Sequence, residues 1–427
     1  MPVVAIVGGQ WGDEGKGKVV DLLAERAHMV VRYSGGSNAG HTIVNDLGTF
    51  RLHLIPSGIF HPKVSCLIGN GVALDPAVLL REIEELTGCG VKMGRLYISD
   101  RAHLVMPYHT LIDKLEEEAR GGGAIGTTLR GIGPAYADKI ARQGLRTCDL
   151  LSENDLRQQL RPILEQKNRL LARLYEANPL DLDEIAQLYI EYGHKLAPYI
   201  RDTGEMARQA VASGQRIVLE GAQGTMLDVD FGTYPYVTSC SPSIGGALTG
   251  LGLAPSAIAE VVAVFKAYTT RVGSGPLPTE LADETGQLIR EHAQEFGATT
   301  GRPRRCGWFD AVVARYAAQV NGCTAFAITR LDVLDILPKI KVCVSYEAEG
   351  KRLSRPPAST ALMERCTPIY EEMEGWREPI TDIRRFADLP RAAQAYVRRL
   401  EELTGCPAAI ISVGPRREET IEVRPLF

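Results

Sequence analysis

A carboxylate and a lysine lie close together in a glycine-rich stretch near the start of the chain. The stretch runs from Val3 to Lys18 as VVAIVGGQWGDEGKGK and contains Asp13 and Lys16. Glycines remove Cβ atoms where the backbone turns, so that amide groups can face an anion at the start of the following helix. The stretch therefore predicts a phosphate-binding loop between a strand and a helix. Because a carboxylate among phosphates repels them unless it holds a cation or takes a proton, we expect Asp13 to be catalytic.

This loop differs from the two common nucleotide-binding patterns. Compared with the G-x-x-x-x-G-K-[ST] loop, the segment from Gly9 to Gly15 is one residue longer, and Gly17 stands where a hydroxyl would bind Mg²⁺. A metal would therefore need ligands elsewhere. A dinucleotide site is disfavoured, because no G-x-G-x-x-G opens the helix and the second predicted strand ends without a ribose-binding acid.

A second glycine-rich loop, GGSNAGHT, spans Gly35 to Thr42 and follows a predicted strand at His28 to Tyr33. Open α/β sheets bind ligands at the carboxyl ends of their strands, which places this loop beside the phosphate site. A nucleophile elbow is excluded, because Ala39 stands where G-x-S-x-G requires glycine. His41 fits two roles equally well, a catalytic imidazole or a hydrogen-bonded loop histidine.

Further loops carry groups suited to anions and to a purine base. The stretch from Gly121 to Gly133 is a linker or a second phosphate site with Thr128, and Gln223 follows a predicted strand with a donor and an acceptor. The arginines between Thr299 and Arg305 suit carboxylates. The T-R-L-D sequence ending at Asp332 is similar to the N/T-K-x-D pattern that binds guanine.

The elements that position these loops alternate between strands and helices. Apolar residues at helical spacing follow the first loop, and further short strands and amphipathic helices extend to Arg120. Two helix-rich segments, Ser152 to Ala177 and Asp183 to Ser213, interrupt the pattern before strands return at Arg216 to Glu220, Glu260 to Thr270 and Ala408 to Ser412. The alternation predicts an α/β fold with a parallel sheet.

The overall composition excludes several classes of partner. The chain has 48 Lys and Arg against 52 Asp and Glu, so that its net charge is −4 and no basic excess indicates nucleic acid or an anionic membrane. Nine cysteines occur without a C-x-x-C pair, as is typical of reduced thiols in a cytoplasmic protein. We find no signal peptide and no run of 18 apolar residues, and we expect a soluble, cytoplasmic protein with small-molecule partners.

Taken in chain order, the motifs resemble the adenylosuccinate synthetase family over essentially the whole length. They are QWGDEGKGK, SNAGHT, GTTLRGIGPAYADK, EGAQGTMLD, GTYPYVTS, KAYTTRVGSGPLPTE, TTGRPRRCGW and TRLDVLD. The resemblance implies a ligase that couples GTP hydrolysis to joining L-aspartate to IMP, the first committed step from IMP to AMP, and that works as a Mg²⁺-dependent homodimer. It implies a single elaborated α/β domain over residues 1–427, with a large, mostly parallel central sheet, a P-loop-like nucleotide site and peripheral subdomains. Residues 101–213 would form a mainly helical excursion, and residues 335–427 would complete the nucleotide site.

The resemblance also implies roles for individual residues. Asp13 would remove the N1 proton of IMP so that O6 attacks the GTP γ-phosphate, with His41, Lys16 and Gln223 as further catalytic groups, and Mg²⁺ would bind Asp13 and Gly40. The implied GTP contacts are Gly12, Asp13, Glu14, Gly15, Lys16, Gly17, Lys18, Gly40, His41, Thr42, Arg304, Arg330, Leu331, Asp332, Ser412, Val413 and Gly414. The implied IMP contacts are Asp13, Lys16, Asn38, Ala39, Gly40, His41, Thr128, Gln223, Thr238 and Arg302, with Arg142 reaching across from the partner subunit. The implied aspartate contacts are Ala298, Thr299, Thr300, Gly301, Arg302 and Arg304.

Three departures from the family pattern stand out. Arg330 replaces a lysine, and it keeps a cationic stem that can lie along the guanine. Leu129 replaces a small or basic residue in the phosphate loop, and the segment 240–243, Cys-Ser-Pro-Ser, differs from the polar run expected after Thr238. The last two would change the shape of the IMP pocket.

Two other functions remain open at this point. A regulatory GTP-binding protein would use the two glycine loops as switches, although it would have no use for the anion sites at 121–133 and 299–305. A kinase would use the same phosphate loop to phosphorylate a small oxo or hydroxyl compound without ligation.

Overall fold

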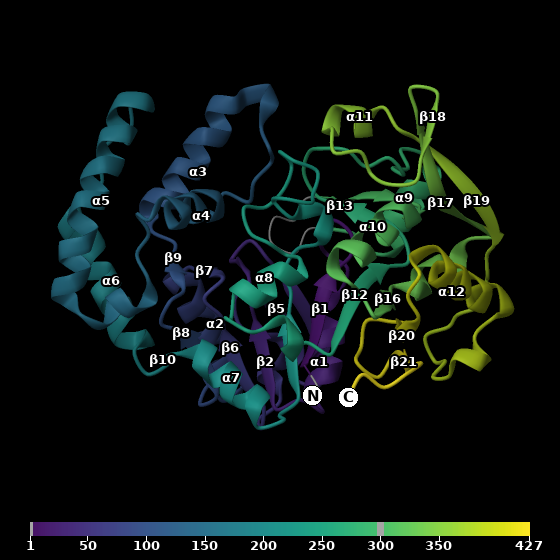
Figure 1. Ribbon diagram of the computed structural model, residues 1–427, viewed down its shortest axis with the longest axis horizontal. Helices are drawn as coiled ribbons and strands as arrows, with labels where there is room; N and C mark the ends of the chain where they lie inside the picture. The colour runs from purple at the N-terminus through teal and green to yellow at the C-terminus, as the bar shows by residue number, and fades with distance from the viewer. Residues whose placement is uncertain (1–2, 297–302) are drawn as a thin grey trace.

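A ten-stranded sheet forms the centre of the molecule in the computed structural model, which describes residues 3–296 and 303–427 (Figure 1). Its strands are parallel throughout, except that the last one pairs antiparallel with its neighbour. In spatial order they are β10 (Ile200–Arg201), β8 (Leu96–Ser99), β6 (Ser65–Ile68), β2 (Met29–Arg32), β11 (Ile217–Glu220), β1 (Val3–Gly8), β12 (Glu260–Lys266), β16 (Ala325–Thr329), β20 (Ala408–Ser412) and β21 (Thr420–Glu422). The prediction of a large, mostly parallel central sheet is confirmed.

Strand β1 lies in the middle of this sheet because its residues are apolar on both faces. Val3, Ala5 and Val7 join the hydrophobic core on one side of the sheet, and Val4 and Ile6 join the core on the other side. Parallel sheets covered on both faces typically have such continuous apolar strands. The first glycine-rich loop therefore starts from a fully buried strand in the middle of the sheet.

Helices cover both faces of the sheet. The core on one side includes side chains of α1, α2, α5 and α6, and the core on the other side includes those of α7, α8, α10 and α12. The helices are α1 (Lys16–Ala24), α2 (Pro76–Gly88), α3 (Pro107–Arg120), α4 (Ile132–Ala141), α5 (Glu153–Leu174), α6 (Leu182–Leu196), α7 (Thr203–Ala212), α8 (Ile244–Thr249), α9 (Glu284–His292), α10 (Ala311–Asn321), α11 (Thr360–Glu364) and α12 (Arg391–Thr404).

Small sheets surround the central one. A hairpin of β4 (His41–Asn45) and β5 (Gly48–Leu52) carries His41, and β3 (Gly35–Gly36), β7 (Val72–Leu74) and β9 (His103–Leu104) form a three-stranded sheet. Two more small sheets follow later in the chain. One pairs β13 (Thr269–Arg271) with β14 (Arg305–Gly307), and the other contains β15 (Phe309–Asp310), β17 (Lys339–Ala348), β18 (Lys351–Leu353) and β19 (Thr367–Glu374).

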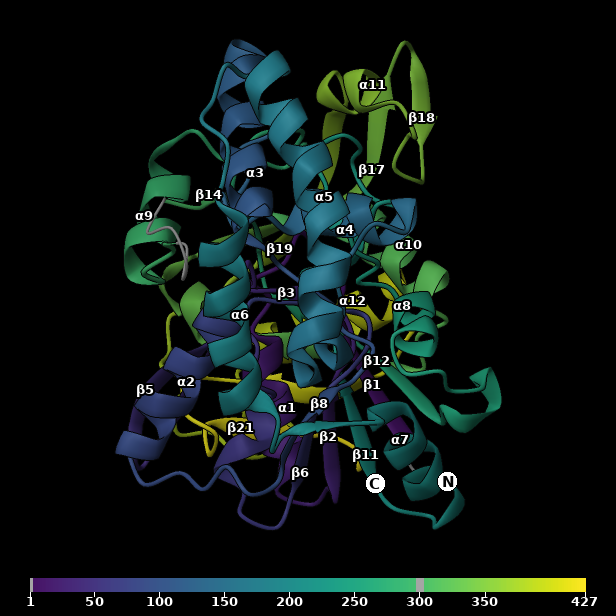
Figure 2. The ribbon, with the colours of Figure 1, turned by 90° about the vertical axis from the view of Figure 1, so that its left-hand side faces the viewer.

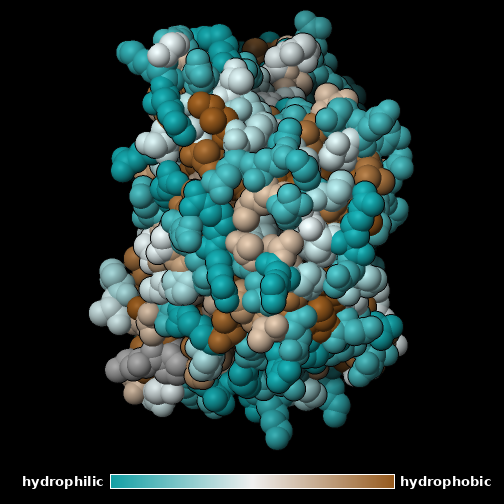
Figure 3. Space-filling model, turned by 90° about the vertical axis from the view of Figure 1, so that its right-hand side faces the viewer, coloured by the Kyte–Doolittle hydropathy of each residue, from teal (hydrophilic) through white to brown (hydrophobic). Residues whose placement is uncertain are grey.

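The helices α3 to α6 gather at one end of the molecule, on the left in Figure 1. Figure 2, which views the molecule from this end, shows α5 and α6 in front, nearest the viewer. At the opposite end α12 and β17 to β19 lie together, and the surface seen from there is mostly hydrophilic with small separate apolar patches (Figure 3). Among the described residues, no helix combines the length and apolar composition needed to span a bilayer.

The structure adds detail to three elements considered in the sequence. The helix-rich segment at 183–213 contains α6 and α7, and between them β10 pairs with β8 at the edge of the central sheet. The strand expected at 260–270 breaks after Lys266, and β13 then joins a separate antiparallel pair with β14. The strand before T-R-L-D ends at Thr329, and a 3-10 helix, η6 (Leu331–Ile336), contains Asp332.

Candidate active site

One cavity of about 840 Å³ lies at the carboxyl ends of the parallel strands. Its walls come from the loops after β1, β2, β11, β12, β16 and β20, which are adjacent in the central sheet. Of the residues predicted from the sequence, those that line the cavity are Gly12, Asp13, Gly15, Lys16, Gly17, Lys18, Asn38, Ala39, Gly40, His41, Thr42, Thr128, Gln223, Thr238, Arg304, Arg330, Ser412 and Gly414. Segments that are far apart in the chain thus meet in a single site.

Some predicted residues do not line this cavity. Glu14 is buried behind the phosphate loop, and Arg142 lines a different cavity. Leu331 and Val413 are fully buried in the hydrophobic core, and Asp332 follows Arg330 behind the wall. The aspartate contacts predicted at residues 298–302 lie outside the described residues, and Arg304 is the only member of that set that the structure describes.

The phosphate loop closes onto the start of helix α1. Gly15 caps the helix with φ +85°, and Asp13 also has a positive φ, +58°, which is uncommon for a residue with a side chain. The Glu14 carboxylate accepts the backbone N–H groups of Gln10 (3.0 Å) and Gly12 (2.9 Å) and forms a buried ion pair with Lys16. Glu14 therefore supports the loop from inside and holds the Lys16 ammonium next to it.

Asp13 belongs to a chain of charged groups across the cavity. Its Oδ2 accepts a hydrogen bond from Arg304 Nε at 2.8 Å, and Arg304 Nη1 donates to Glu295 Oε2 at 2.5 Å. Glu295 is wholly buried and also binds Lys266 Nζ at 2.8 Å. Burial alone would raise the pKa of Glu295, but Lys266, Arg304 and Arg330 lower it to about 2. Glu295 is thus an ionised anchor for the cations around it.

His41 rests on a second buried carboxylate. Its Nδ1 forms a hydrogen bond with Glu220 Oε1, and Arg32 Nη1 lies 3.3 Å from the same oxygen. Burial and the Arg32 guanidinium lower the pKa of His41 to about 4, so that the imidazole is neutral at pH 7. Burial alone would raise the pKa of Glu220, but His41, Arg32 and the backbone N–H of Ser57 lower it to about 2. The carboxylate is therefore ionised, and Nδ1 of the neutral ring carries the hydrogen between them.

The amide of Gln223 is oriented by two neighbours. Its Nε2 donates to Asn38 Oδ1 at 3.2 Å, and its Oε1 accepts from Cys240 Sγ at 3.5 Å. Gln223 follows β11 in the loop after Glu220, has a φ of +54° and lines the cavity. Cys240, one of the departures from the family pattern, thus contacts a predicted catalytic residue directly.

The glycine-rich stretch after α3 is held by two carboxylates rather than hanging free as a linker. Glu117 accepts the backbone N–H groups of Ile125 (3.1 Å), Gly126 (2.7 Å) and Thr127 (3.2 Å). Asp113 accepts from Gly131 N at 2.9 Å. These contacts fix the loop on which Thr128 faces the cavity. The side chain of Leu129 is 42% exposed, and this residue does not line the cavity.

At the far end of the cavity, Lys18 joins helix α1 to the C-terminal loop. Its Nζ donates to Ser412 Oγ (2.7 Å), Gly414 O (2.6 Å) and Glu419 O (2.8 Å). Burial lowers the pKa of Lys18 to about 8, although Asp332 and Glu419 oppose the shift. Oδ1 of Asp332 is buried and lacks a hydrogen-bond partner within the described chain, as expected of an acceptor that waits for a ligand.

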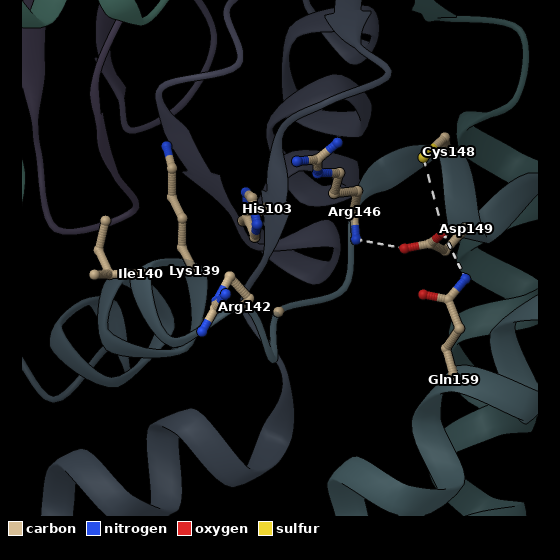
Figure 4. A pocket seen from close by; sticks show the side chains of 9 residues that line it. His103, Lys139, Ile140, Arg142, Arg146, Cys148, Asp149 and Gln159 are labelled. Atoms are coloured by element: carbon tan, nitrogen blue, oxygen red, sulfur yellow. Dashed lines mark hydrogen bonds between the residues drawn. The ribbon is translucent and has the colours of Figure 1, made fainter.

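Arg142 lies in a second cavity, of about 520 Å³, between α4 and the start of α5 (Figure 4). Lys139, Arg146 and His103 line the same cavity, which is rich in positive charge. Burial and the charges of Lys139 and Arg146 lower the pKa of His103 to about 4. Arg142 has a left-handed backbone, with φ +63°, and its side chain is exposed.

The donor set around Asp13 fits a magnesium ion. Asp13 and Gly40 both line the main cavity, and Arg304 engages only Oδ2 of the carboxylate. Magnesium prefers oxygen ligands and commonly takes one or two from protein while water and phosphate supply the rest. In the part of the chain that the structure describes, no group of three or more His, Cys, Asp or Glu side chains is placed to hold a metal alone.

Sequence reasoning missed the buried charges that support the predicted residues. Three of these charged residues, Arg32, Glu220 and Lys266, each end an apolar strand. A charge at the end of such a strand could have indicated a buried ion pair. Glu295 and Arg271 had no comparable signal. Arg271 is 2% exposed and donates to Thr233 Oγ1 and to the carbonyl groups of Tyr236, Ser274 and Pro276, so that it joins the loops on one side of the cavity.

Known proteins resemble the chain over its full length. The model of the adenylosuccinate synthetase family matches residues 5–421. An adenylosuccinate synthetase from Dehalococcoides mccartyi is 55% identical over 421 residues, covering 99% of this chain and 100% of the relative. One from Carboxydothermus hydrogenoformans is 54% identical over 427 residues, covering 100% of both chains.

A solved structure agrees with these relatives. The fully ligated adenylosuccinate synthetase from Plasmodium falciparum superposes with a TM-score of 0.94 at 37% identity, covering 99% of this chain and 100% of that one. The chain therefore belongs to the adenylosuccinate synthetase family.

Proposed function

We infer that this chain is a GTP-dependent ligase that joins L-aspartate to IMP and releases adenylosuccinate, GDP and phosphate. The observation that carries this inference is the main cavity, which collects a phosphate loop, a carboxylate, an imidazole and an amide from distant parts of the chain. Membership of the family supports the same reaction and argues against a regulatory GTP-binding protein or a simple kinase.

We propose that Asp13 is the base that starts the reaction. The 6-oxo group of IMP is a poor leaving group, so it must become a phosphate ester before an amine can displace it. Asp13 would take the N1 proton while O6 forms a bond to the γ-phosphorus and the bridging P–O bond breaks, releasing GDP. The amino group of aspartate would then form the C6–N bond and lose a proton, and the phosphate would leave with the electrons of the C6–O bond and take up that proton.

The neighbouring groups would stabilise the charge that moves during these steps. Lys16 is held beside the phosphate loop by Glu14, from where it can turn to the transferring phosphoryl group. His41 lines the cavity next to the loop, and its Nε2, which carries no hydrogen in the neutral ring, would take the proton that the amino group of aspartate loses and pass it to the departing phosphate. Gln223 would contact the purine, since its amide is oriented by Asn38 and Cys240. These contacts support the roles that the sequence predicted.

Magnesium would be held by Asp13 and by the carbonyl group of Gly40. Bound there, it would neutralise negative charge on the phosphates of GTP. Arg304 would release Asp13 as the metal and substrates enter and would then be free to meet a carboxylate of aspartate. Arg330, Asp332 and the 412–414 segment would hold the guanine, with the partnerless Oδ1 of Asp332 accepting its N–H groups.

We propose that the working enzyme is a homodimer in the cytoplasm. Arg142 points into the second cavity and lies away from the main cavity of its own chain, as a residue that completes a neighbouring site would. Ile140, next to it, has a side chain that is 77% exposed, which suits burial against a second copy. All nine cysteines are free thiols, as in a reducing compartment.

One assay tests the reaction as a whole. Purified protein with GTP, IMP, aspartate and Mg²⁺ is expected to form adenylosuccinate and GDP in equal amounts, and omission of either IMP or aspartate should stop both. GTP turnover that continues without aspartate would contradict ligation and favour a kinase. GTP turnover that continues without IMP would favour a regulatory GTPase.

A further inference from the structure

We propose that Glu220 is a positioning residue that fixes both the orientation and the tautomer of His41. The inference deepens the proposed function and rests on it only for the consequence in catalysis. Glu220 lies behind His41 and takes no part in the roles assigned above.

The Glu220 carboxylate is held rigidly at the end of β11. Its side chain is fully buried, and its backbone lies directly opposite Arg32 in the pairing of β11 with β2. Oε1 accepts from Ser57 Oγ at 2.7 Å and from His41 Nδ1, and Arg32 Nη1 lies 3.3 Å away. Oε2 accepts from the backbone N–H of Ser57 at 2.8 Å. The acceptor that faces His41 therefore cannot move away from it.

Both oxygens of Glu220 face groups that can only donate, the backbone N–H of Ser57 at Oε2 and Arg32 Nη1 at Oε1, so both oxygens accept and Nδ1 of His41 must donate. Arg32 Nη1 lies 3.1 Å from Nδ1, but both groups are donors, and both are directed at Oε1 of Glu220. The nitrogen left for the substrate is Nε2. In carboxylate–imidazole pairs the carboxylate selects the tautomer in this way and orients the ring toward the reacting group.

A simpler alternative is that Glu220 only balances the buried charge of Arg32. The contacts favour the positioning role, because Arg32 is the most distant of the groups around the carboxylate. Arg32 also donates to Ser34 O at 3.3 Å. Charge balance alone would not require the close contacts to His41 and Ser57.

The substitution Glu220→Gln separates the two ideas. The backbone N–H of Ser57 cannot turn away, so the amide oxygen of glutamine must take the Oε2 position. The amide NH₂ then occupies the Oε1 position and donates toward Nδ1 of His41. Nδ1 becomes an acceptor, and the ring hydrogen moves to Nε2, while the size of the side chain hardly changes.

Nitrogen-15 NMR of histidine-labelled protein without substrates reads the tautomer directly. The resonances of His41 are assigned by comparison with His41→Asn. In the unsubstituted protein we expect the hydrogen on Nδ1, and in Glu220→Gln we expect it on Nε2. The same tautomer in both proteins would overturn the proposal, whatever reaction the enzyme catalyses.

Kinetics give the second measurement. Glu220→Gln is expected to lower kcat by roughly 100-fold or more while KM for GTP and IMP changes little, because the ring stays in place with the wrong tautomer. Wild-type kcat would overturn the positioning role. Failure of the unsubstituted protein to form adenylosuccinate would instead contradict the proposed function and leave the NMR result standing.

Two further variants serve as controls for misfolding. Glu220→Asp keeps a negative charge near Arg32 but withdraws it from Nδ1 by one methylene group, so it should fold and still lose kcat. Full activity in this variant would mean that charge balance is sufficient. Asp310→Asn is the matched control, because Asp310 is also a fully buried carboxylate but caps α10 away from the cavity. It should change neither the His41 tautomer nor kcat.

Discussion

Replacing Asp13 with asparagine removes the proposed base while keeping the shape of its side chain. Asp13 has a φ of +58°, a left-handed conformation that asparagine adopts much more readily than most residues with a side chain. Its carboxylate is 31% exposed and pairs with Arg304, which stays bound to Glu295 in the variant. Asp13→Asn therefore changes the chemistry of the loop and leaves its backbone intact.

The structure sets different magnitudes for activity and for stability. Loss of a general base typically lowers the rate by about 10²–10⁴-fold. Loss of a partly exposed ion pair costs at most about 1 kcal/mol, so we expect the melting temperature to fall by only a few degrees. Asp13→Ala would cost roughly 1–2 kcal/mol more, because alanine is strained at positive φ. Asparagine is therefore the cleaner variant.

The assay follows adenylosuccinate formation together with isotope exchange within GTP. When O6 attacks, the β,γ-bridging oxygen of labelled GTP exchanges with its neighbours, even without aspartate. We expect Asp13→Asn to lose both activities, and Asp382→Asn, an exposed acidic residue outside the cavity, to keep them. A folded Asp13→Asn variant that retains a tenth or more of wild-type kcat would refute the base role.

Three further predictions follow from single residues. Lys18→Met should raise KM for GTP by about 10-fold or more, because three acceptors in the 412–419 loop lose a charged donor. In the unsubstituted enzyme, KM for GTP should rise above about pH 8, where Lys18 loses its proton. Burial raises the pKa of Asp310 to about 6, so the folded state loses stability as the pH rises from about 4 to 6. Asparagine carries no charge at this position, so Asp310→Asn should raise the free energy of unfolding at pH 8 by up to about 3 kcal/mol, measured by urea titration. Mixing Asp13→Asn with Arg142→Ala subunits should restore about a quarter of wild-type activity, because half of the dimers then hold one intact site; no recovery in dimers shown to exchange subunits would place Arg142 outside the neighbouring site.

The loops that touch the cavity could be predicted from the sequence because each is a local pattern. An apolar β-branched run that stops at glycines predicts a strand and a phosphate loop, and the structure has β1 and α1 at those positions. Parallel strands end at one edge of their sheet, so loops such as the one that carries His41 and the one that carries Gln223 had to converge.

The exact role of a residue within the cavity depends on contacts across the whole chain. Lys18 follows Lys16 in the same loop, and the pattern grouped both with the phosphates of GTP. The structure shows that Lys18 Nζ is bound to Ser412 and Gly414, almost four hundred residues away in the chain. Lys18 is thus part of the cavity wall beside the 412–414 segment rather than a group free to bind phosphate. Nothing local to the loop distinguishes the two lysines.

Buried charges show why strand order limits sequence-based prediction. Arg32 and Glu220 each end an otherwise apolar strand, and each alone would be a costly charge in the core. They become a pair only because β2 and β11, which are distant in sequence, are neighbours in the sheet and pair residue for residue. The same pairing places the Glu220 carboxylate behind His41, which enters from a hairpin on a third segment. A sequence pattern can therefore predict which groups line the cavity, whereas the groups that orient them follow only from the order of the strands.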